Sequence, residues 1–195
     1  MKIVFATNNP HKLAEVQEIL GPGFELATPA ACGITEEIPE TEPTLEGNAR
    51  LKARYIYERT GLDCFADDTG LEVAALGGAP GVYSARYAGG PGHDSAANMA
   101  CLLRNMEGIA DRRARFRTAV CLIEAGREHL FEGTVEGEIT REPAGCDGFG
   151  YDPVFRPEGR QCTFAEMSHE EKNAISHRGR AMQRLAAYLH AAKEK

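Results

Sequence analysis

The stretch Ala66-Asp67-Asp68-Thr69-Gly70 places two adjacent carboxylates directly after the short apolar run Cys64-Phe65-Ala66. An apolar run followed by polar residues and a glycine is typical of a buried strand that ends in a tight loop at a cleft. Carboxylates are costly to bury without a counter-charge, so the pair indicates a bound cation, usually Mg²⁺. Because Mg²⁺ in proteins is commonly shared between carboxylates and phosphate oxygens, the stretch predicts phosphate chemistry.

Asp68 is the member of the pair that we expect to be functional, because it stands between a core strand and a glycine. Asp67 has an ordinary alternative role, since its side chain could cap the following turn. Two further carboxylates are candidates: Glu40, in an acidic loop over residues 33–47, and Glu72, just beyond the pair. We interpret the remaining glutamates of that loop as solvated charge: Glu36, Glu37, Glu42 and Glu46.

The chain has 195 residues, of which 43% are hydrophobic and 26% are charged, which is sufficient for one sizeable core with room for two lobes. Its net charge of −7 argues against binding nucleic acid through a general positive field. No apolar run approaches the length of a membrane span, and Asn8 and Asn9 interrupt the apolar N-terminus too early for a signal peptide. We therefore expect a small-molecule ligand, and neither a nucleic acid nor a membrane as partner.

The cysteines indicate a reducing compartment. None of the six belongs to a C-x-x-C pair, and several lie in apolar runs typical of a core. We interpret them as reduced thiols of a cytoplasmic protein, and their spacing argues against a zinc site. They stand at positions 32, 64, 101, 121, 146 and 162.

The order of the predicted elements indicates an α/β fold. Strands and helices alternate in the first part of the chain, and two later strands joined at Gly126 form an antiparallel hairpin. This order predicts a three-layer α/β protein with a mixed sheet, with glycine-rich loops over residues 77–92 and 143–153. The expected strands are Lys2–Ala6, Phe24–Ala27, Cys64–Ala66, Phe116–Glu124 and His129–Ile139, and the expected helices are His11–Leu20, Asn48–Arg59, Ser95–Met106 and Ser176–Lys195.

The turn Thr7-Asn8-Asn9-Pro10 precedes the first predicted helix. Asn9 is a favourable N-cap, and Pro10 fits the first helical position. Lys12 then lies in the first turn, where acidic residues are normally preferred. Free backbone N–H groups together with a lysine would bind an anion, whereas the alternative is an ordinary capped helix with a solvated lysine. No Walker loop, G-x-x-x-x-G-K-[ST], occurs in the sequence.

Two later segments combine glycines, aromatic residues and cations. In Gly145–Pro153, Phe149 could stack on a base, although aromatic residues in such a turn can also belong to the core. In Glu171–Arg180, Lys172 could meet a phosphate, and Arg178 could offer paired donors to a carbonyl oxygen. The alternative for these cations is a helix start with solvated basic residues.

Five groups of motifs occur in one order along nearly the whole chain. Together they resemble the inosine triphosphate pyrophosphatase family, whose members are also called dITP/XTP pyrophosphatases, and the agreement is far greater than chance gives. The motifs are Ala6–Lys12; Glu40-Thr41 with Thr44-Leu45 and Asn48-Ala49; Ala66–Glu72; Leu76–Gly89; and Gly148–Phe155 with Glu171–Asn173 and Ser176–Arg178.

The resemblance implies a three-layer α/β/α fold with a long mixed central sheet, in which residues 1–195 form a single domain of two lobes around one cleft. It implies hydrolysis of ITP, dITP and XTP to the monophosphate and pyrophosphate, with Mg²⁺ as cofactor, by a homodimer. Two alternatives stay open at this stage. One is a pyrophosphatase for modified pyrimidine triphosphates, and the other is a nucleotide-binding module without catalysis, which would not need Asp68.

Carried over by motif, Asp68 is the expected metal ligand and proton acceptor, and Glu40 is the expected second metal ligand. Gly47 stands where many members of the family have a glutamate, so any part played by that glutamate has no counterpart here. Arg178 has only donors, which match the six-oxo group of hypoxanthine and xanthine and not the six-amino group of adenine. The residues expected to contact substrate are Thr7, Asn8, Asn9, Pro10, His11 and Lys12 at the triphosphate, Thr69, and Phe149, Gly150, Tyr151, Asp152, Lys172, His177 and Arg178 at the nucleoside.

Overall fold

The computed structural model describes residues 2–89 and 93–193. They form two compact units, each with its own hydrophobic core. Unit 1 contains the chain up to Asp68, Thr118–Gly133 and the chain from Arg178 onward, and unit 2 contains Thr69–Arg117 and Thr134–His177. The chain therefore first passes from unit 1 to unit 2 between Asp68 and Thr69.

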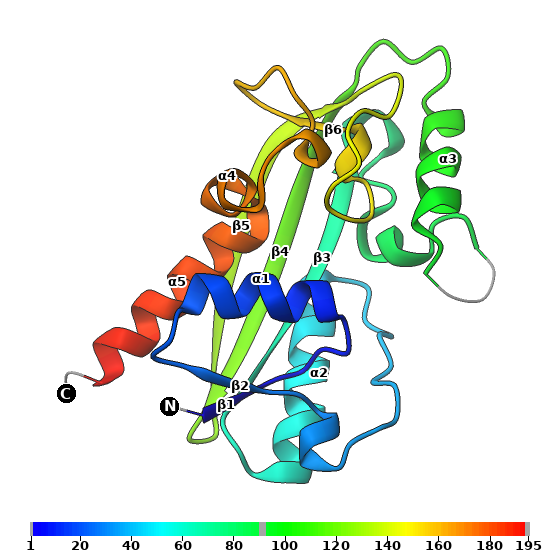
Figure 1. The fold of residues 1–195 in the computed structure, drawn as a ribbon. Coiled ribbons are helices and arrows are strands. Elements are labelled where there is room, and N and C mark those ends of the chain that lie inside the picture. Colours follow the sequence, from blue (N-terminus) through cyan, green and yellow to red (C-terminus); the bar gives the residue numbers. More distant parts are fainter. Residues whose placement is uncertain (1, 90–92, 194–195) are drawn as a thin grey trace. The chain divides into compact units, whose positions relative to one another are not determined.

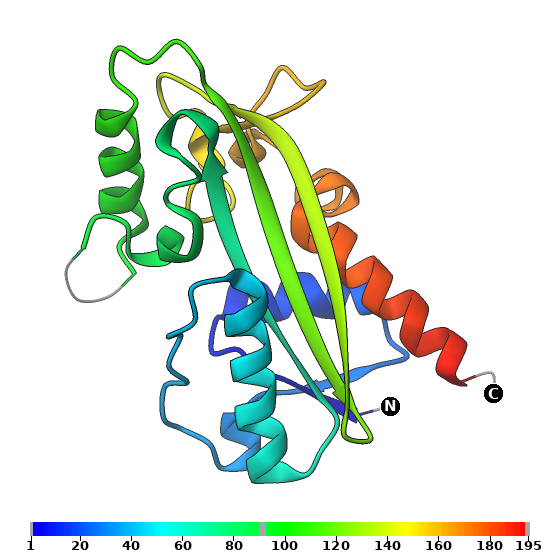
Figure 2. The ribbon, with the colours of Figure 1, turned by 180° about the vertical axis from the view of Figure 1, so that it is seen from behind.

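Unit 1 has helices on both faces of its strands. It contains β1 (Lys2–Phe5), α1 (Pro10–Leu20), β2 (Glu25–Ala27), α2 (Leu45–Thr60), the start of β3 (Cys64–Val73) and most of α5 (His177–Lys193). Figures 1 and 2 show α1 and α5 on one face of these strands and α2 on the opposite face. β1 pairs in parallel with β2 and with β3. Unit 1 thus has the α/β/α layering that the sequence predicted.

Apolar side chains at helical spacing close the core of unit 1. Val16 and Leu20 of α1 and Leu185 and Leu189 of α5, each pair four residues apart, are buried in one cluster. The rings of Phe5 and Phe65, from the paired strands β1 and β3, stack with centroids 4.6 Å apart in the same cluster. Ala192, which the helical spacing of the sequence adds to the same face of α5, lies outside the residues whose side chains the structure describes.

Unit 2 holds the other ends of the long strands. It contains α3 (Ser95–Asn105), β6 (Phe155–Pro157), α4 (His169–Ile175) and parts of β3, β4 (Arg113–Glu124) and β5 (Arg127–Ile139). β4 and β5 are neighbours joined by the short turn at Ala125-Gly126, which confirms the predicted hairpin. The sheet order is β2-β1-β3-β4-β5-β6, with parallel pairs at β1 and an antiparallel pair between β5 and β6, so the predicted mixed sheet is confirmed.

The prediction that the strand after residue 64 ends at the aspartate pair is wrong. β3 continues through Asp68 to Val73, and Gly70 is not among the glycines with positive φ. The strand continues because Leu71 and Val73 are buried in the core of unit 2 and the N–H of Leu71 donates to Ser84 Oγ at 2.8 Å. The aspartates therefore lie inside a strand and not in a loop.

Several boundaries differ from the predicted ones for local reasons. α2 begins three residues early, because Thr44 caps it by accepting the N–H of Gly47 at 3.0 Å. α4 was not predicted, and its capping box at Ser168 and Glu171 defines it. The 3₁₀ turns are Ala30–Cys32, Ala74–Leu76, Gly81–Arg86, Asp152–Val154 and Phe164–Glu166. The third of these lies in the predicted loop over residues 77–92, of which residues 90–92 are outside the described part. None of the described helices combines the length and apolar character needed to cross a bilayer.

Candidate functional site

Asp67 and Asp68 have different partners because they are neighbours within β3. Successive side chains of a strand point to opposite faces. Asp67 contacts Lys12 of α1 and Arg178 of α5, whereas Asp68 contacts Lys52 of α2 on the other layer. Both carboxylates are buried, with exposures of 1% and 6%. The two aspartates therefore form their ion pairs with different cations.

Asp68 is held by two side chains from one face of α2. Asn48 Nδ2 donates to Asp68 Oδ2 at 3.1 Å, and Lys52 Nζ donates to Asp68 Oδ1 at 3.2 Å. Lys52 Nζ also donates to Glu40 Oε1 at 2.6 Å. The predicted catalytic residue and the predicted second metal ligand thus meet at one ammonium group.

Asn48 and Lys52 were not assigned to the site from the sequence as substrate or metal contacts. Both are buried polar residues on α2, four positions apart, among buried Leu45, Ala49 and Ile56. A lysine on an apolar helix face is almost never buried without a carboxylate partner. The position of Lys52 on an apolar helix face could therefore have indicated a carboxylate partner, but it does not say which carboxylate that is.

The charges around Asp68 suit a proton acceptor. Burial raises the pKa of Asp68 above its ordinary value, and Glu40 adds to this rise, while Lys52 and Lys12 oppose it. A carboxylate with a higher pKa is a stronger base. Burial alone would lower the pKa of Lys52, but the negative charges of Asp68 and Glu40 raise it above its ordinary value. Lys52 is therefore a permanent cation beside the base.

Asp67 belongs to the second cluster, on the side of α1 and α5. Lys12 Nζ lies 3.1 Å from Asp67 Oδ2, and Arg178 Nε donates to the same oxygen at 3.4 Å. Arg178 Nη1 donates to Glu15 Oε2 at 2.6 Å, and this arginine is 2% exposed. Burial alone would raise the pKa of Asp67, but the positive charges of Lys12 and Arg178 lower it below its ordinary value. Glu15, which the sequence reasoning missed, lies three residues after Lys12 on the same helix.

The N-terminus of α1 is capped as predicted, but the cap uses the donors that were expected to be free. Asn9 is the N-cap, Pro10 opens the helix, and Asn9 Oδ1 accepts from the N–H groups of His11 at 2.9 Å and Lys12 at 3.3 Å. Thr7 Oγ1 accepts from the N–H of Asn9 at 3.1 Å. An anion at this helix start would therefore depend on the Lys12 ammonium, or on displacement of the Asn9 side chain.

Unit 2 brings together three residues predicted at the nucleoside. Asp152 Oδ2 accepts from Lys172 Nζ at 2.9 Å and from the N–H of Phe149 at 2.8 Å. Lys172 Nζ also lies 4.8 Å from the centroid of the Phe149 ring. Gly148 has φ +78°, and a Cβ there would lie 2.3 Å from Asp152 Oδ2. The glycine is thus required by both its backbone conformation and the adjacent carboxylate.

Two other predicted residues of unit 2 are buried. The His177 ring stacks on Phe116 with centroids 4.6 Å apart and an angle of 14° between the planes. Tyr151 donates its hydroxyl to the carbonyl oxygen of Ser84 at 2.7 Å, and burial raises its pKa. Tyr151 therefore behaves as the core aromatic residue that the sequence left open as an alternative.

The predicted site residues divide between the two units. Thr69, which is half-buried, follows Asp68 in β3 and is the first residue of unit 2. Unit 1 contains Thr7, Asn8, Asn9, Pro10, His11, Lys12, Glu40, Asp68 and Arg178. Unit 2 contains Thr69, Phe149, Gly150, Tyr151, Asp152, Lys172 and His177.

The oxygen donors at Lys52 fit Mg²⁺. Glu40 Oε1 and Asp68 Oδ1 both approach the same ammonium nitrogen, so they can approach one small cation. Mg²⁺ is commonly bound by one or two carboxylates, with water and phosphate oxygens completing its octahedron. In the part of the chain that the structure describes, no group of three or more His, Cys, Asp or Glu residues is arranged to hold a metal. The two carboxylates therefore suit a metal that is shared with a phosphate ligand.

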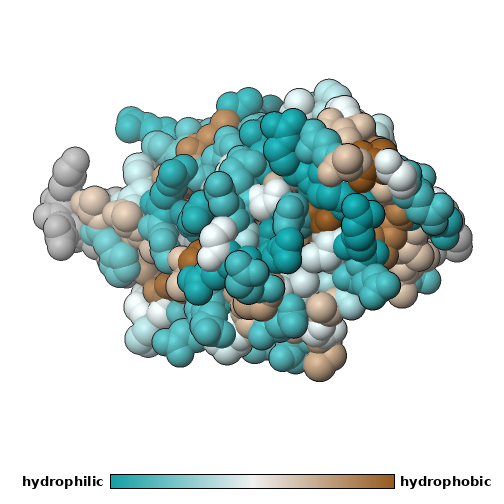
Figure 3. All heavy atoms as spheres, turned by 90° about the horizontal axis from the view of Figure 1, so that it is seen from above, coloured by the Kyte–Doolittle hydropathy of each residue, from teal (hydrophilic) through white to brown (hydrophobic). Residues whose placement is uncertain are grey.

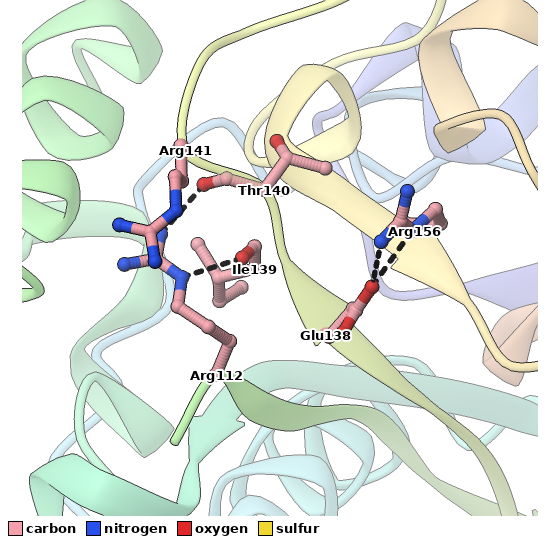
Figure 4. Close-up of a pocket in the computed structure, with 6 residues that line it drawn as sticks. All are labelled: Arg112, Glu138, Ile139, Thr140, Arg141 and Arg156. Atoms are coloured by element: carbon pink, nitrogen blue, oxygen red, sulfur yellow. Dashed lines mark hydrogen bonds and ion pairs between the residues drawn. The ribbon is translucent and has the colours of Figure 1, made fainter. Parts of the chain in front are cut away.

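A separate pocket of about 340 Å³ lies in unit 2 and is shown in Figure 4. Arg112 donates from Nε to the carbonyl of Ile139 at 2.7 Å and from Nη2 to that of Thr140 at 2.6 Å. Arg156 is paired with Glu138. Most of the charged side chains that line this pocket are therefore already paired with other groups of the chain. Its lining contains none of the predicted site residues and consists of Arg112, Glu138, Ile139, Thr140, Arg141 and Arg156.

Hydrophilic residues cover most of the face drawn in Figure 3, and apolar residues form small separate patches on it. Among the described residues, the large apolar side chains that are exposed are Leu62, Tyr83 and Leu130. Single exposed apolar side chains are ordinary on protein surfaces and indicate no particular partner.

Comparisons with known proteins agree over nearly the whole length. The sequence model of the Ham1 family matches residues 3–188. A dITP/XTP pyrophosphatase from Porphyromonas gingivalis is 52% identical over 193 residues, covering 98% of this chain and 99% of that protein. A HAM1 protein structure from Coxiella burnetii has a TM-score of 0.90 and 41% identity, covering 98% of this chain and 99% of its own. The structure of the Staphylococcus aureus Ham1 protein has a TM-score of 0.90 and 37% identity, with coverages of 98% and 100%.

Proposed function

We propose that this chain, which belongs to the Ham1 family, hydrolyses ITP, dITP and XTP to the monophosphate and pyrophosphate in the presence of Mg²⁺. The substrate class is taken from the name of the Porphyromonas gingivalis relative. The observation that carries the chemistry is the buried Asp68, fixed between Asn48 and Lys52 with a raised pKa and with Glu40 beside it.

In the proposed reaction, Asp68 accepts a proton from a water whose oxygen attacks a phosphorus atom of the triphosphate. The P–O bond between the attacked phosphorus and the oxygen that bridges the α and β phosphorus atoms breaks, and the electron pair leaves on that oxygen. Attack on the α or on the β phosphorus gives the same two products, so hydrolysis in ¹⁸O-labelled water distinguishes the two. Glu40 and Asp68 would hold Mg²⁺, which when bound neutralises phosphate charge and polarises the attacking water.

We assign Lys12 and the loop before it to the triphosphate, and Phe149, Lys172 and Arg178 to the base. Lys12 and the loop Thr7–His11 would contact the phosphates, and Phe149 would stack on the base beside Lys172. Arg178 would favour the six-oxo purines, because its donors match an oxo group and leave an adenine amine unpaired. The salt bridges from Glu15 and Asp67 support this assignment by fixing the direction of the guanidinium.

We further propose that residues 1–195 act as one domain and that the protein is a cytoplasmic homodimer. All six cysteines are free thiols in the structure, which supports a reducing compartment. Sedimentation of the purified protein tests the dimer, and a single species of monomer mass at micromolar concentration would exclude it.

A substrate panel tests the proposed function. ITP, dITP, XTP, GTP, ATP and modified pyrimidine triphosphates are compared by kcat/KM with and without Mg²⁺, and pyrophosphate release is measured. The expected result is metal-dependent turnover that favours the six-oxo purines ITP, dITP and XTP. A preference for the modified pyrimidines would favour the related pyrophosphatase, and binding without turnover would favour a nucleotide-binding module.

A further inference from the structure

The ammonium of Lys52 occupies the position between the two proposed metal ligands. Its Nζ lies 2.6 Å from Glu40 Oε1 and 3.2 Å from Asp68 Oδ1, and its side chain is 8% exposed. Lys52 is therefore an internal counter-ion of the carboxylates that would bind Mg²⁺.

A metal ion bound by the same two oxygens would compete with this ammonium. Mg²⁺ binds carboxylate oxygens at about 2.1 Å, so it would lie close to the position of the Lys52 nitrogen. Two cations at such a separation in a buried site repel each other strongly. We infer that Lys52 and Mg²⁺ exchange at Glu40 and Asp68, so that metal binding displaces the lysine from both carboxylates. This inference rests on the proposed use of Mg²⁺.

The exchange gives the displaced lysine a function. Its flexible four-carbon stem lets the ammonium move while the Cα atom stays in α2. Asp68 keeps its second hydrogen bond, because Asn48 donates to the other oxygen, Oδ2. A released ammonium needs a new acceptor, and the triphosphate that arrives with the metal provides phosphate oxygens. Metal and nucleotide binding would therefore be coupled through Lys52, with no large change in the backbone.

The test measures metal affinity in the absence of nucleotide. Mn²⁺ is titrated by electron paramagnetic resonance into the unaltered protein and into Lys52→Met, which has similar length but no charge. Without the competing ammonium, Lys52→Met is expected to bind Mn²⁺ about tenfold tighter or more. Lys172→Met is the control, because Lys172 is also a buried lysine but pairs with Asp152 of unit 2, and without nucleotide its Mn²⁺ affinity should match that of the unaltered protein. Adding Glu40→Gln to Lys52→Met should abolish the gain.

An equal or weaker Mn²⁺ affinity in Lys52→Met, including no measurable binding by either protein, overturns the inference. If that variant does not fold, acetylation of the unaltered protein by a limiting reagent decides instead. Mass spectrometry should then show that Mg²⁺ increases labelling of Lys52 relative to exposed Lys2, compared with NaCl at equal ionic strength, and an unchanged ratio contradicts the exchange. Turnover of dITP is measured separately. Turnover without a gain in Mn²⁺ affinity in Lys52→Met refutes only the exchange. The absence of turnover refutes only the proposed function.

Discussion

Gly148 lies where an added methyl group would meet the carboxylate of Asp152. Its φ is +78°, and an ideal Cβ would lie 2.3 Å from Asp152 Oδ2, far inside the contact distance of carbon and oxygen. That oxygen already accepts from Lys172 at 2.9 Å and from the N–H of Phe149 at 2.8 Å. In Gly148→Ala the carboxylate must therefore move away from both donors, and buried Lys172 loses the geometry of its ion pair.

Gly150 provides the matched control in the same loop. Its φ is +65°, but an added Cβ would have no atom within 4 Å. Gly150→Ala should therefore cost only the left-handed backbone conformation, about 1–2 kcal/mol of unfolding free energy. Gly148→Ala has the same backbone cost and in addition disturbs a buried charge pair, for which we expect about 2 kcal/mol more.

The two variants are compared by urea denaturation, and their KM values for dITP are measured in parallel. The expected result is a larger loss of stability in Gly148→Ala together with a higher KM, because Lys172 and Phe149 are both proposed to contact the nucleoside. Equal losses of stability in the two variants would show that the Asp152 carboxylate moves freely. That result would refute the reasoning that this contact fixes the loop.

Three further outcomes are expected. Asp68→Asn should keep the fold, as judged by circular dichroism, but its kcat should fall about 10²–10⁴-fold, since general-base catalysis contributes that much. Near-normal turnover at saturating Mg²⁺ would exclude Asp68 as the base. Arg178→Ala should lower the ratio of kcat/KM for ITP over ATP, and an unchanged ratio would remove Arg178 from base selection. Because the pKa of Asp67 is lowered in the folded protein, its ionisation stabilises the fold above the ordinary pKa of about 4 and this contribution is lost as pH falls further. The difference in unfolding free energy between the unaltered protein and Asp67→Asn should therefore be largest at neutral pH and shrink below pH about 4, and a pH-independent difference would contradict the lowered pKa.

Features that depend on neighbours in sequence were predictable. The cap at Asn9, the first helical residue Pro10 and the glycines that end the helices at Gly21 and Gly61 follow from local backbone chemistry, and all are present. The buried faces of α1 and α5 follow from spacing in the same way. The motif resemblance also identified the family, because motifs are local patterns.

Features that depend on distant pairing were not predictable. Nothing local to Lys52 says that it pairs with Glu40 and Asp68, which are 12 and 16 residues away. The length of β3 was misjudged for a related reason. A glycine after polar residues is typical of a turn, and here the burial of Leu71 and Val73 in a second core keeps the chain extended.

The two aspartates are neighbours in sequence but differ in the charged side chains that surround them. Asp67 and Glu15 face Lys12 and Arg178, so those four side chains carry two negative and two positive charges. Asp68 and Glu40 share the ammonium of Lys52, so these three groups carry one more negative than positive charge. A divalent cation is therefore attracted to the side of Asp68, while the balanced side keeps Arg178 in place. Because β3 continues past the pair, the two adjacent carboxylates point to opposite faces of the strand and have different proposed roles.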